Sequence, residues 1–308
     1  MANKDVPSSY SMFANVYSYM GLPLSRNIES ADVVVMGIPY DIGTTGRAGT
    51  RHGPQGVRLA SGNLRWEEKR WPWQFSVMDR LKVIDYGDLE FKPSESTSMI
   101  ETVIEHVGAV HAKGKKTLCF GGDHFVTLPL LRAVHEQHGP VALVHFDAHT
   151  DTYTPEYDEP ESYDHGCMFY YAPKEGLVDP DHSIQVGIRT EYDNQSHLFE
   201  VIDAASANDL SSTDVVKAIR ERVGDMPVYL TFDIDCLDPA YAPGTGTPVV
   251  GGITTDRALK IIRGLQGLNI VGADVVEVAP SYDHSEITAL AAATIGLEIL
   301  YVMASEVG

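Results

Sequence analysis

The sequence predicts an α/β fold with a mostly parallel sheet, on two observations. About eight short runs rich in β-branched residues alternate with stretches of helical spacing, an order typical of parallel strands joined by crossover helices. Charged side chains also collect where several of these runs end, and ligands of such sheets gather at the carboxyl ends of the strands. A (β/α)₈ barrel has the same alternation, so the pattern allows either an open sheet or a closed barrel.

The expected strands are short and bounded by turn-forming residues. The first, 32–36, is β-branched and is followed by Gly37 and Pro39, which punctuate strands. A later apolar run begins at Val141 and leads directly into Asp147. The remaining expected strands are 82–86, 117–120, 184–188, 199–202, 228–235 and 270–278.

Five stretches are expected to be helices. Apolar residues recur at helical spacing over 98–113, and Gly114 follows as a stop signal. Ser211 begins a later helix, with Asp214 three positions on as a variant capping box. The other expected helices are 126–138, 255–264 with Thr255 as its cap, and 286–304. The last contains the most apolar stretch, 289–303, which Glu298 interrupts; we expect a buried helix, too short to span a bilayer.

The segment 37–54 is rich in glycine but lacks two familiar phosphate-binding patterns. It has no Gly-Lys-Ser/Thr ending of a P-loop, and its glycine spacing is not that of a dinucleotide fingerprint. We therefore expect a tight loop whose glycines permit unusual backbone angles, tied to acidic partners by Arg47, Arg51 and Arg58.

Charge and cysteine content narrow the class of protein. Asp and Glu number 43 against 23 Lys and Arg, a formal net charge of −20; this disfavours nucleic acid as a partner and could steer a cationic substrate. Three cysteines with no Cys-x-x-Cys pair argue against a disulfide framework. The N-terminus has no apolar core of signal-peptide length. We expect a cytoplasmic protein with no membrane partner.

Three of the expected strands end in carboxylates and imidazoles. Two of these ends place the side chains at i and i+2, which share one face of a strand, and the third is a Gly-Gly-Asp-His turn. A single Asp-x-His is usually only a turn, but three such ends in one chain indicate a common site. The candidate metal ligands are His124, Asp147, His149, Asp151, Asp233 and Asp235.

The ligand types indicate a hard or borderline metal. Carboxylate oxygens with imidazole suit Mn, Fe, Zn or Mg. Six ligands exceed the needs of one ion, whereas two ions about 3.5 Å apart, bridged by carboxylates and hydroxide, would use them well. Cys236 follows Asp235 and is expected to point to the opposite face of the strand.

Four motifs together resemble the ureohydrolase family, which includes arginases and agmatinases. They are G-G-D-H (121–124), F-D-A-H-T-D (146–151), F-D-I-D-C-L-D-P (232–239) and V-V-E-V-A-P (275–280). The resemblance extends over roughly residues 30–305. It implies a three-layer α/β/α domain around an eight-stranded mostly parallel sheet, two Mn²⁺ ions per subunit, and hydrolysis of a guanidinium to urea. Family members are usually homo-oligomers, often trimers or hexamers.

The domain is expected to span 31–308, after an N-terminal arm (1–30) that packs on the domain or on a neighbouring subunit. Trp66, Trp71 and Trp73 lie close together in the sequence and could form an interface or a core patch.

The resemblance also implies a role for each site residue. His124 and Asp151 would hold one manganese, His149 and Asp235 the other, with Asp147 and Asp233 as bridges. Asp151 would also orient the attacking hydroxide. Glu277 resembles the family's guanidinium-binding carboxylate, and His165 its proton-shuttling histidine. Taken alone, Glu277 could be an acid that caps a loop, and His165 an ordinary loop histidine.

Two stretches, 165–177 and 285–294, resemble bacterial agmatinases, whereas 161–166 does not match the arginase pattern. The implied reaction is agmatine plus water giving putrescine and urea, a step of putrescine and spermidine biosynthesis. The ammonium tail of agmatine could face acidic residues of the 152–164 loop, although these could equally be a solvated surface: Glu156, Asp158, Glu159 and Glu161.

Three alternatives remain open. The protein could be another amidinohydrolase, such as a guanidinobutyrase, whose substrate ends in a carboxylate. It could be a mononuclear zinc deacetylase on a related fold. It could also be a non-catalytic protein that binds metal or polyamines.

Overall fold

The computed structural model describes residues 17–67, 69–155 and 163–306. Within these residues one sheet contains β1 (Val33–Ile38), β2 (Val83–Asp88), β3 (Lys116–Gly121), β4 (Ala142–Phe146), β5 (Ile184–Ile188), β6 (Glu200–Asp203), β7 (Val228–Asp233) and β8 (Ile270–Val276). All neighbouring strands are parallel. The order β2-β1-β3-β8-β7-β4-β5-β6 leaves β2 and β6 as separate edges. The parallel sheet is confirmed, and the barrel alternative is wrong.

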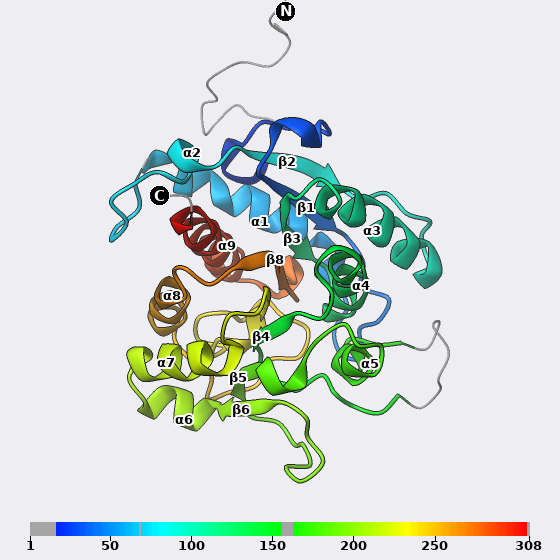
Figure 1. The fold of residues 1–308 in the computed structure, drawn as a ribbon, viewed down its shortest axis with the longest axis vertical. Helices are drawn as coiled ribbons and strands as arrows, with labels where there is room; N and C mark the ends of the chain where they lie inside the picture. The colour runs from blue at the N-terminus through cyan, green and yellow to red at the C-terminus, as the bar shows by residue number, and fades with distance from the viewer. Residues whose placement is uncertain (1–16, 68, 156–162, 307–308) are drawn as a thin grey trace, which may run out of the picture.

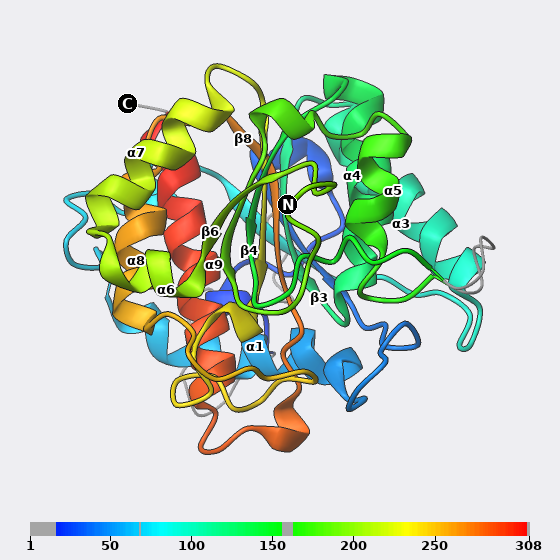
Figure 2. The same cartoon turned by 90° about the horizontal axis from the view of Figure 1, so that it is seen from below.

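Helices cover both faces of the sheet. The described helices are α1 (Gly53–Ser61), α2 (Val77–Arg80), α3 (Ser96–His111), α4 (Thr127–His138), α5 (Met168–Lys174), α6 (Ala204–Asp209), α7 (Ser212–Val223), α8 (Thr255–Gly264) and α9 (Ile287–Ser305). Figure 2 shows α3, α4 and α5 on one side of the strands and α1, α7, α8 and α9 on the other. A separate hydrophobic core fills each side. The expected three layers are confirmed (Figure 1).

Every predicted strand and helix is present within two residues of its predicted ends. Ser211 caps α7 as expected, because its side chain accepts a hydrogen bond from Asp214 N at 3.1 Å. The cap of α8 is Thr254 and not Thr255; its hydroxyl accepts from Arg257 N at 3.1 Å. Four short helices, α1, α2, α5 and α6, were not predicted.

The glycine-rich segment is a loop only as far as residue 49. A single 3₁₀ turn follows and α1 begins at Gly53, with Pro54 in its first turn, a position that favours proline. The expectation of a loop through residue 54 was therefore wrong at its end.

Two of the three arginines in and after this segment reach acidic partners as expected. Arg51 pairs with Asp41. Arg58 lies in α1, and its guanidinium binds Asp85 at 2.8 and 2.9 Å. Arg47 differs, because its guanidinium donates to the backbone carbonyls of Thr245 at 3.0 Å and Gly246 at 3.3 Å.

Helix α9 lies in the core. With 19 residues the helix is longer than the apolar stretch 289–303, and it is long and apolar enough to cross a membrane by length and composition only. The expected burial is confirmed, since 83% of the most apolar part of this helix is buried. Its one charge, Glu298, is fully buried and accepts from Arg263 Nη2 at 2.5 Å and from Trp73 Nε1 at 2.6 Å.

The three tryptophans separate in the structure. Trp73 belongs to the core and stacks on Tyr301 with ring centroids 4.9 Å apart. Trp66 and Trp71 are 69% and 79% exposed. Part of the segment 17–30 also packs on the domain, because Tyr19 is buried and its hydroxyl donates to Ala293 O at 2.7 Å.

Candidate metal and catalytic site

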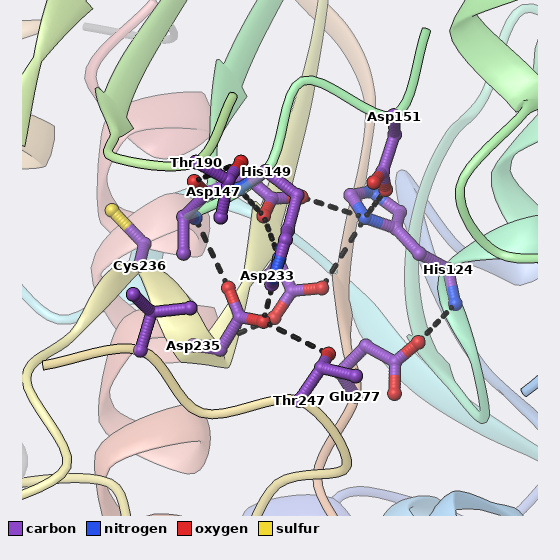
Figure 3. A network of polar contacts seen from close by, with 12 residues as sticks. His124, Asp147, His149, Asp151, Thr190, Asp233, Asp235, Cys236, Thr247 and Glu277 are labelled. Carbon is purple, nitrogen blue, oxygen red and sulfur yellow. Dashed lines mark hydrogen bonds and ion pairs between the residues drawn. The ribbon is translucent and has the colours of Figure 1, made fainter. Parts of the chain in front are cut away.

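The candidate residues meet at the carboxyl edge of the four central strands. His124 follows β3, Asp147 follows β4, Asp233 ends β7 and Glu277 follows β8, and these strands are neighbours in the order β3-β8-β7-β4. Figure 3 shows their side chains pointing toward one another. Asp235 lies in a 3₁₀ turn (Ile234–Cys236) and not on a strand as expected.

The same local turn builds both aspartate pairs. Asp147 Oδ1 accepts from His149 N at 2.6 Å, and Asp233 Oδ1 accepts from Asp235 N at 2.7 Å. An aspartate that binds the backbone two residues on closes a tight turn. This turn, and not the alternation of a strand, brings the side chain at i+2 round to the first carboxylate.

The side chains form two groups that share Asp147. In the first group His124 Nδ1 lies 3.0 Å from Asp147 Oδ2, 3.0 Å from Asp151 Oδ2 and 3.3 Å from Asp233 Oδ2. In the second, His149 Nδ1 lies 3.1 Å from Asp235 Oδ2 and 3.4 Å from Asp147 Oδ1. The two oxygens of Asp147 thus face different groups. Asp233 contacts only the first, because its other oxygen accepts the backbone of Asp235.

The hydrogen bonds of His124 show what its other nitrogen can bind. Thr231 has one hydroxyl proton, which it donates to Asp274 Oδ1 at 2.5 Å. Thr231 must therefore accept at 2.8 Å from His124 Nε2, which carries a proton. Nδ1 has no hydrogen-bond partner among the described residues and faces three carboxylates. This nitrogen needs a cation, either a proton or a metal ion, so the donor set fits a metal.

The pKa values report the crowding of negative charge at this site. Burial, followed by Asp147, raises the pKa of Asp151 to about 7. Burial, followed by Asp235 and Asp147, raises the pKa of Asp233 well above its ordinary value. Burial alone would lower the pKa of His124, but the carboxylates of Asp147, Asp151 and Asp233 around its Nδ1 raise this pKa far above the usual range. A divalent cation among these groups would relieve the repulsion.

Two site residues have a left-handed backbone. Asp151 has φ 50° and Glu277 has φ 64°, a conformation that costs a non-glycine residue about 1–3 kcal/mol and persists where the surrounding structure imposes it. Both side chains point into the site (Figure 3). The strained backbone at Asp151 and Glu277 therefore occurs where the chain directs a carboxylate into the site.

Glu277 and His165 lie beside the first group. Glu277 Oε1 contacts His165 Nδ1 at 2.7 Å and accepts from His124 N at 2.9 Å. Its second oxygen, Oε2, has no partner among the described residues, although Glu277 is 1% exposed. Burial lowers the pKa of His165, but Glu277 raises it to about 9. An unpaired buried carboxylate oxygen next to a cationic histidine can bind a planar donor such as a guanidinium.

Two neighbours of the site were missed in the sequence. Thr45, in the glycine-rich loop, approaches His165 Nε2 with its amide at 3.0 Å and its hydroxyl at 2.7 Å. His145 donates from Nε2 to Asp147 Oδ2 at 2.7 Å. The signal for His145 was present, because it stands two residues before Asp147 on β4 and so shares its face. Nothing in the sequence relates Thr45 to His165, which is 120 positions away.

The cysteines take no part in the described groups. Cys119, Cys167 and Cys236 are free and buried. Cys236 Sγ lies 3.4 Å from Val186 O, on the far side of the turn that carries Asp235. The four acidic residues proposed to face an ammonium tail lie outside the described residues: Glu156, Asp158, Glu159 and Glu161.

The whole domain matches a known family. The model of the Arginase family matches residues 31–301, so the chain belongs to the arginase family of ureohydrolases. It is a hydrolase that acts on an amidine C–N bond, and the predicted family resemblance is confirmed. This assignment disfavours both the deacetylase and the non-catalytic alternative.

Individual relatives show which members of this family the chain resembles. The chain is 57% identical over 301 residues to the agmatinase of Serratia proteamaculans, covering 97% of each chain. It superposes on the crystal structure of a hypothetical agmatinase from Burkholderia thailandensis with a TM-score of 0.92 and 47% identity, covering 96% of this chain and 92% of that one. For the proclavaminate amidino hydrolase of Streptomyces clavuligerus the TM-score is 0.90 at 38% identity, with 96% and 100% covered. The predicted resemblance to bacterial agmatinases is confirmed.

Proposed function

We propose that this protein is an agmatinase that uses two Mn²⁺ ions to hydrolyse agmatine to putrescine and urea, a step of polyamine biosynthesis. Its relatives at 56–57% identity are named agmatinase. The observation that carries the proposal is the shared carboxylate of Asp147 between two imidazole-carboxylate groups, beside the unpaired Oε2 of Glu277.

The proposed ligands follow the two groups except at Asp233, whose carboxylate contacts only the first group. His124 and Asp151 would hold one ion and His149 and Asp235 the other, with Asp147 and Asp233 as the shared carboxylates. When bound, two such ions lower the pKa of a water and so supply a nucleophile near neutral pH. Manganese suits the carboxylate excess, because oxygen ligands favour harder metals than sulfur ligands do.

The remaining side chains bind the substrate and move its proton. Glu277 would receive the guanidinium on Oε2 and place its carbon over the carboxylates. Asp151 would orient the nucleophile. His165 would protonate the leaving amine, because its contact with Glu277 holds it beside the bound group. The buried setting strengthens each of these interactions, since little water screens them.

The proposal also covers the domain, the location and the assembly of the protein. We propose that residues 31–308 form one domain, that the protein is cytoplasmic, and that it assembles into a homo-oligomer, a trimer or a hexamer. The acidic residues of the 152–164 loop would bind the ammonium group of agmatine. Sedimentation of the purified protein tests the oligomeric state. Neutralising all four acidic loop residues tests whether the loop recognises the ammonium group, and retained activity would contradict that role.

The direct test measures urea released by the Mn²⁺-loaded protein from agmatine, arginine and 4-guanidinobutyrate side by side. A strong preference for agmatine is expected. Preference for 4-guanidinobutyrate would support the hydrolytic mechanism but would show that agmatine is not the substrate. No urea from any of the three, with two metal ions bound, would contradict the proposal.

A further inference from the structure

We propose that Gln185 is a positioning residue that fixes the carboxylate of Asp147 through His145, and thereby sets the affinity of the site for its metal ions. This inference rests on the metal site proposed above. It concerns a glutamine outside every candidate ligand set, on the strand next to the one that leads into Asp147.

The register of the sheet places the two residues together. β4 and β5 pair in parallel with His145 opposite Gln185, and both side chains are fully buried. Gln185 Nε2 lies 2.8 Å from His145 Nδ1 and 2.7 Å from Thr150 O. Its Oε1 lies 2.7 Å from His197 Nε2. All the polar atoms of this buried amide therefore have partners.

These contacts determine the direction of each hydrogen bond. Thr150 O can only accept, so the amide NH₂ of Gln185 must face it and also donates to His145 Nδ1. His145 then carries its proton on Nε2 and donates it to Asp147 Oδ2 at 2.7 Å. Both nitrogens of His145 are occupied, so it orients Asp147 and is not itself a ligand. The chain of donors runs from His197 through Gln185 and His145 to the carboxylate.

The effect on Asp147 is to fix the plane of its carboxylate. Oδ2 accepts from His145, and Oδ1 accepts from the backbone of His149 at 2.6 Å. A carboxylate shared by two ions must keep both oxygens in place. Gln185 also holds Thr150, which lies between His149 and Asp151, so one side chain restrains both the shared carboxylate and the loop 147–151.

The outer end of the chain of donors lies at the surface. His197 helps line a cavity of about 410 Å³, together with Tyr192 and Phe199. His197 Nε2 donates to Gln185 Oε1 and does not contact Asp147 directly. Its loss should therefore matter less than the loss of Gln185.

The test compares Gln185→Met with Ser183→Ala. Met keeps the volume of Gln185 but removes both donors. Ser183 lies beside the start of β5, is also fully buried, and makes two hydrogen bonds far from the site, to Leu143 N and Asp179 O. Its variant reports the cost of losing buried hydrogen bonds alone. Metal affinity is measured by competition with a chelator, and the melting temperature of each metal-free protein is recorded in parallel.

We expect Gln185→Met to weaken Mn²⁺ binding by about 10–100-fold, while Ser183→Ala keeps the affinity of the natural protein. His197→Phe should weaken binding by less than Gln185→Met, and it serves as the variant if Gln185→Met does not fold. The exchange-coupled spectrum of a manganese pair should also change in Gln185→Met at saturating metal, which a general loss of stability would not cause.

Equal metal affinity in the natural protein, Gln185→Met and His197→Phe would overturn the inference and leave the agmatinase proposal intact. If the natural protein itself bound no Mn²⁺, the proposed function would fail first.

Discussion

At the level of single residues, two buried atoms of the site have no hydrogen-bond partner in the part of the chain that the structure describes. His124 Nδ1 and Glu277 Oε2 both lack partners among the described residues. A buried polar atom without a partner costs about 1–3 kcal/mol, so the fold keeps these two atoms unpaired at the expense of stability. Under the proposed function, binding of a metal ion and of a guanidinium would offset this cost.

Glu277→Gln should lower kcat/KM for agmatine by at least about 30-fold, because loss of one partner of a buried charge pair costs about 2–5 kcal/mol. The variant keeps the size of the side chain, so its metal content should not change. Urea release and metal analysis of the same sample measure both. Glu175→Gln, which removes an exposed partner of Arg132, is the control. Unchanged kcat/KM in Glu277→Gln would remove this residue from substrate binding.

Thr45→Val should lower kcat by about 2–10-fold, the equivalent of one hydrogen bond, because the hydroxyl no longer restrains His165. Thr44→Val is a matched control from the same loop, since the Thr44 hydroxyl has no partner among the described residues. Steady-state kinetics at saturating agmatine distinguishes them. An equal loss in both variants would indicate damage to the loop and not a contact with the histidine.

At the scale of elements, the strand ends carry the chemistry and the helices hold them in place. β3, β8, β7 and β4 supply the site because they are neighbours in the middle of the sheet. Buried polar contacts also join helices to strands away from the site. His111 on α3 is 1% exposed and contacts Thr117 Oγ1 of β3 at 3.1 Å.

His111 should make the protein less stable as pH falls. Burial, followed by His138, lowers the pKa of His111 to about 4, whereas an unfolded histidine titrates near 6.5. Between these values the unfolded chain binds more protons, so stability is complete above about pH 6.5 and is lost toward about pH 4, by up to about 3 kcal/mol. Urea unfolding of the metal-free protein across this range measures the slope.

His111→Gln should flatten that slope, and His52→Gln, at an exposed histidine, should leave it unchanged. The same slope in His111→Gln and the natural protein would assign the acid sensitivity to other groups.

At the scale of the whole molecule, the metal site should contribute to stability. Burial, followed by repulsion from Asp147, raises the pKa of Asp151 to about 7, and a bound cation would oppose both effects. Binding to the folded state alone stabilises it by about 3–4 kcal/mol when free metal exceeds its dissociation constant by 100- to 1,000-fold. Chelation should therefore lower the melting temperature, and Mn²⁺ should restore it.

Asp147→Asn should respond less to added Mn²⁺ than the natural protein does, because this carboxylate is shared by both groups. Scanning calorimetry with and without Mn²⁺ compares the two. An equal rise in melting temperature in both proteins would place the metal elsewhere in the molecule.

Local sequence patterns predict the strands and most of the residues that meet at the candidate site. Strands end where apolar β-branched runs meet Gly, Pro or Asp, and this signal is local, so each predicted strand is present. The ligand motifs are also local: in Asp147-Ala148-His149 and Asp233-Ile234-Asp235, one turn brings two side chains together. Four short helices escaped prediction because elements of 4–9 residues hold too few turns to show a period.

Local patterns do not predict how the strands, helices and site residues are arranged in space. The open sheet, and not a barrel, follows from strand order, which depends on contacts between distant segments. The contact of Thr45 with His165 and the contact of Gln185 with His145 also join distant segments. Each joins residues through hydrogen-bond geometry or register, and neither quantity is encoded in a short stretch of chain.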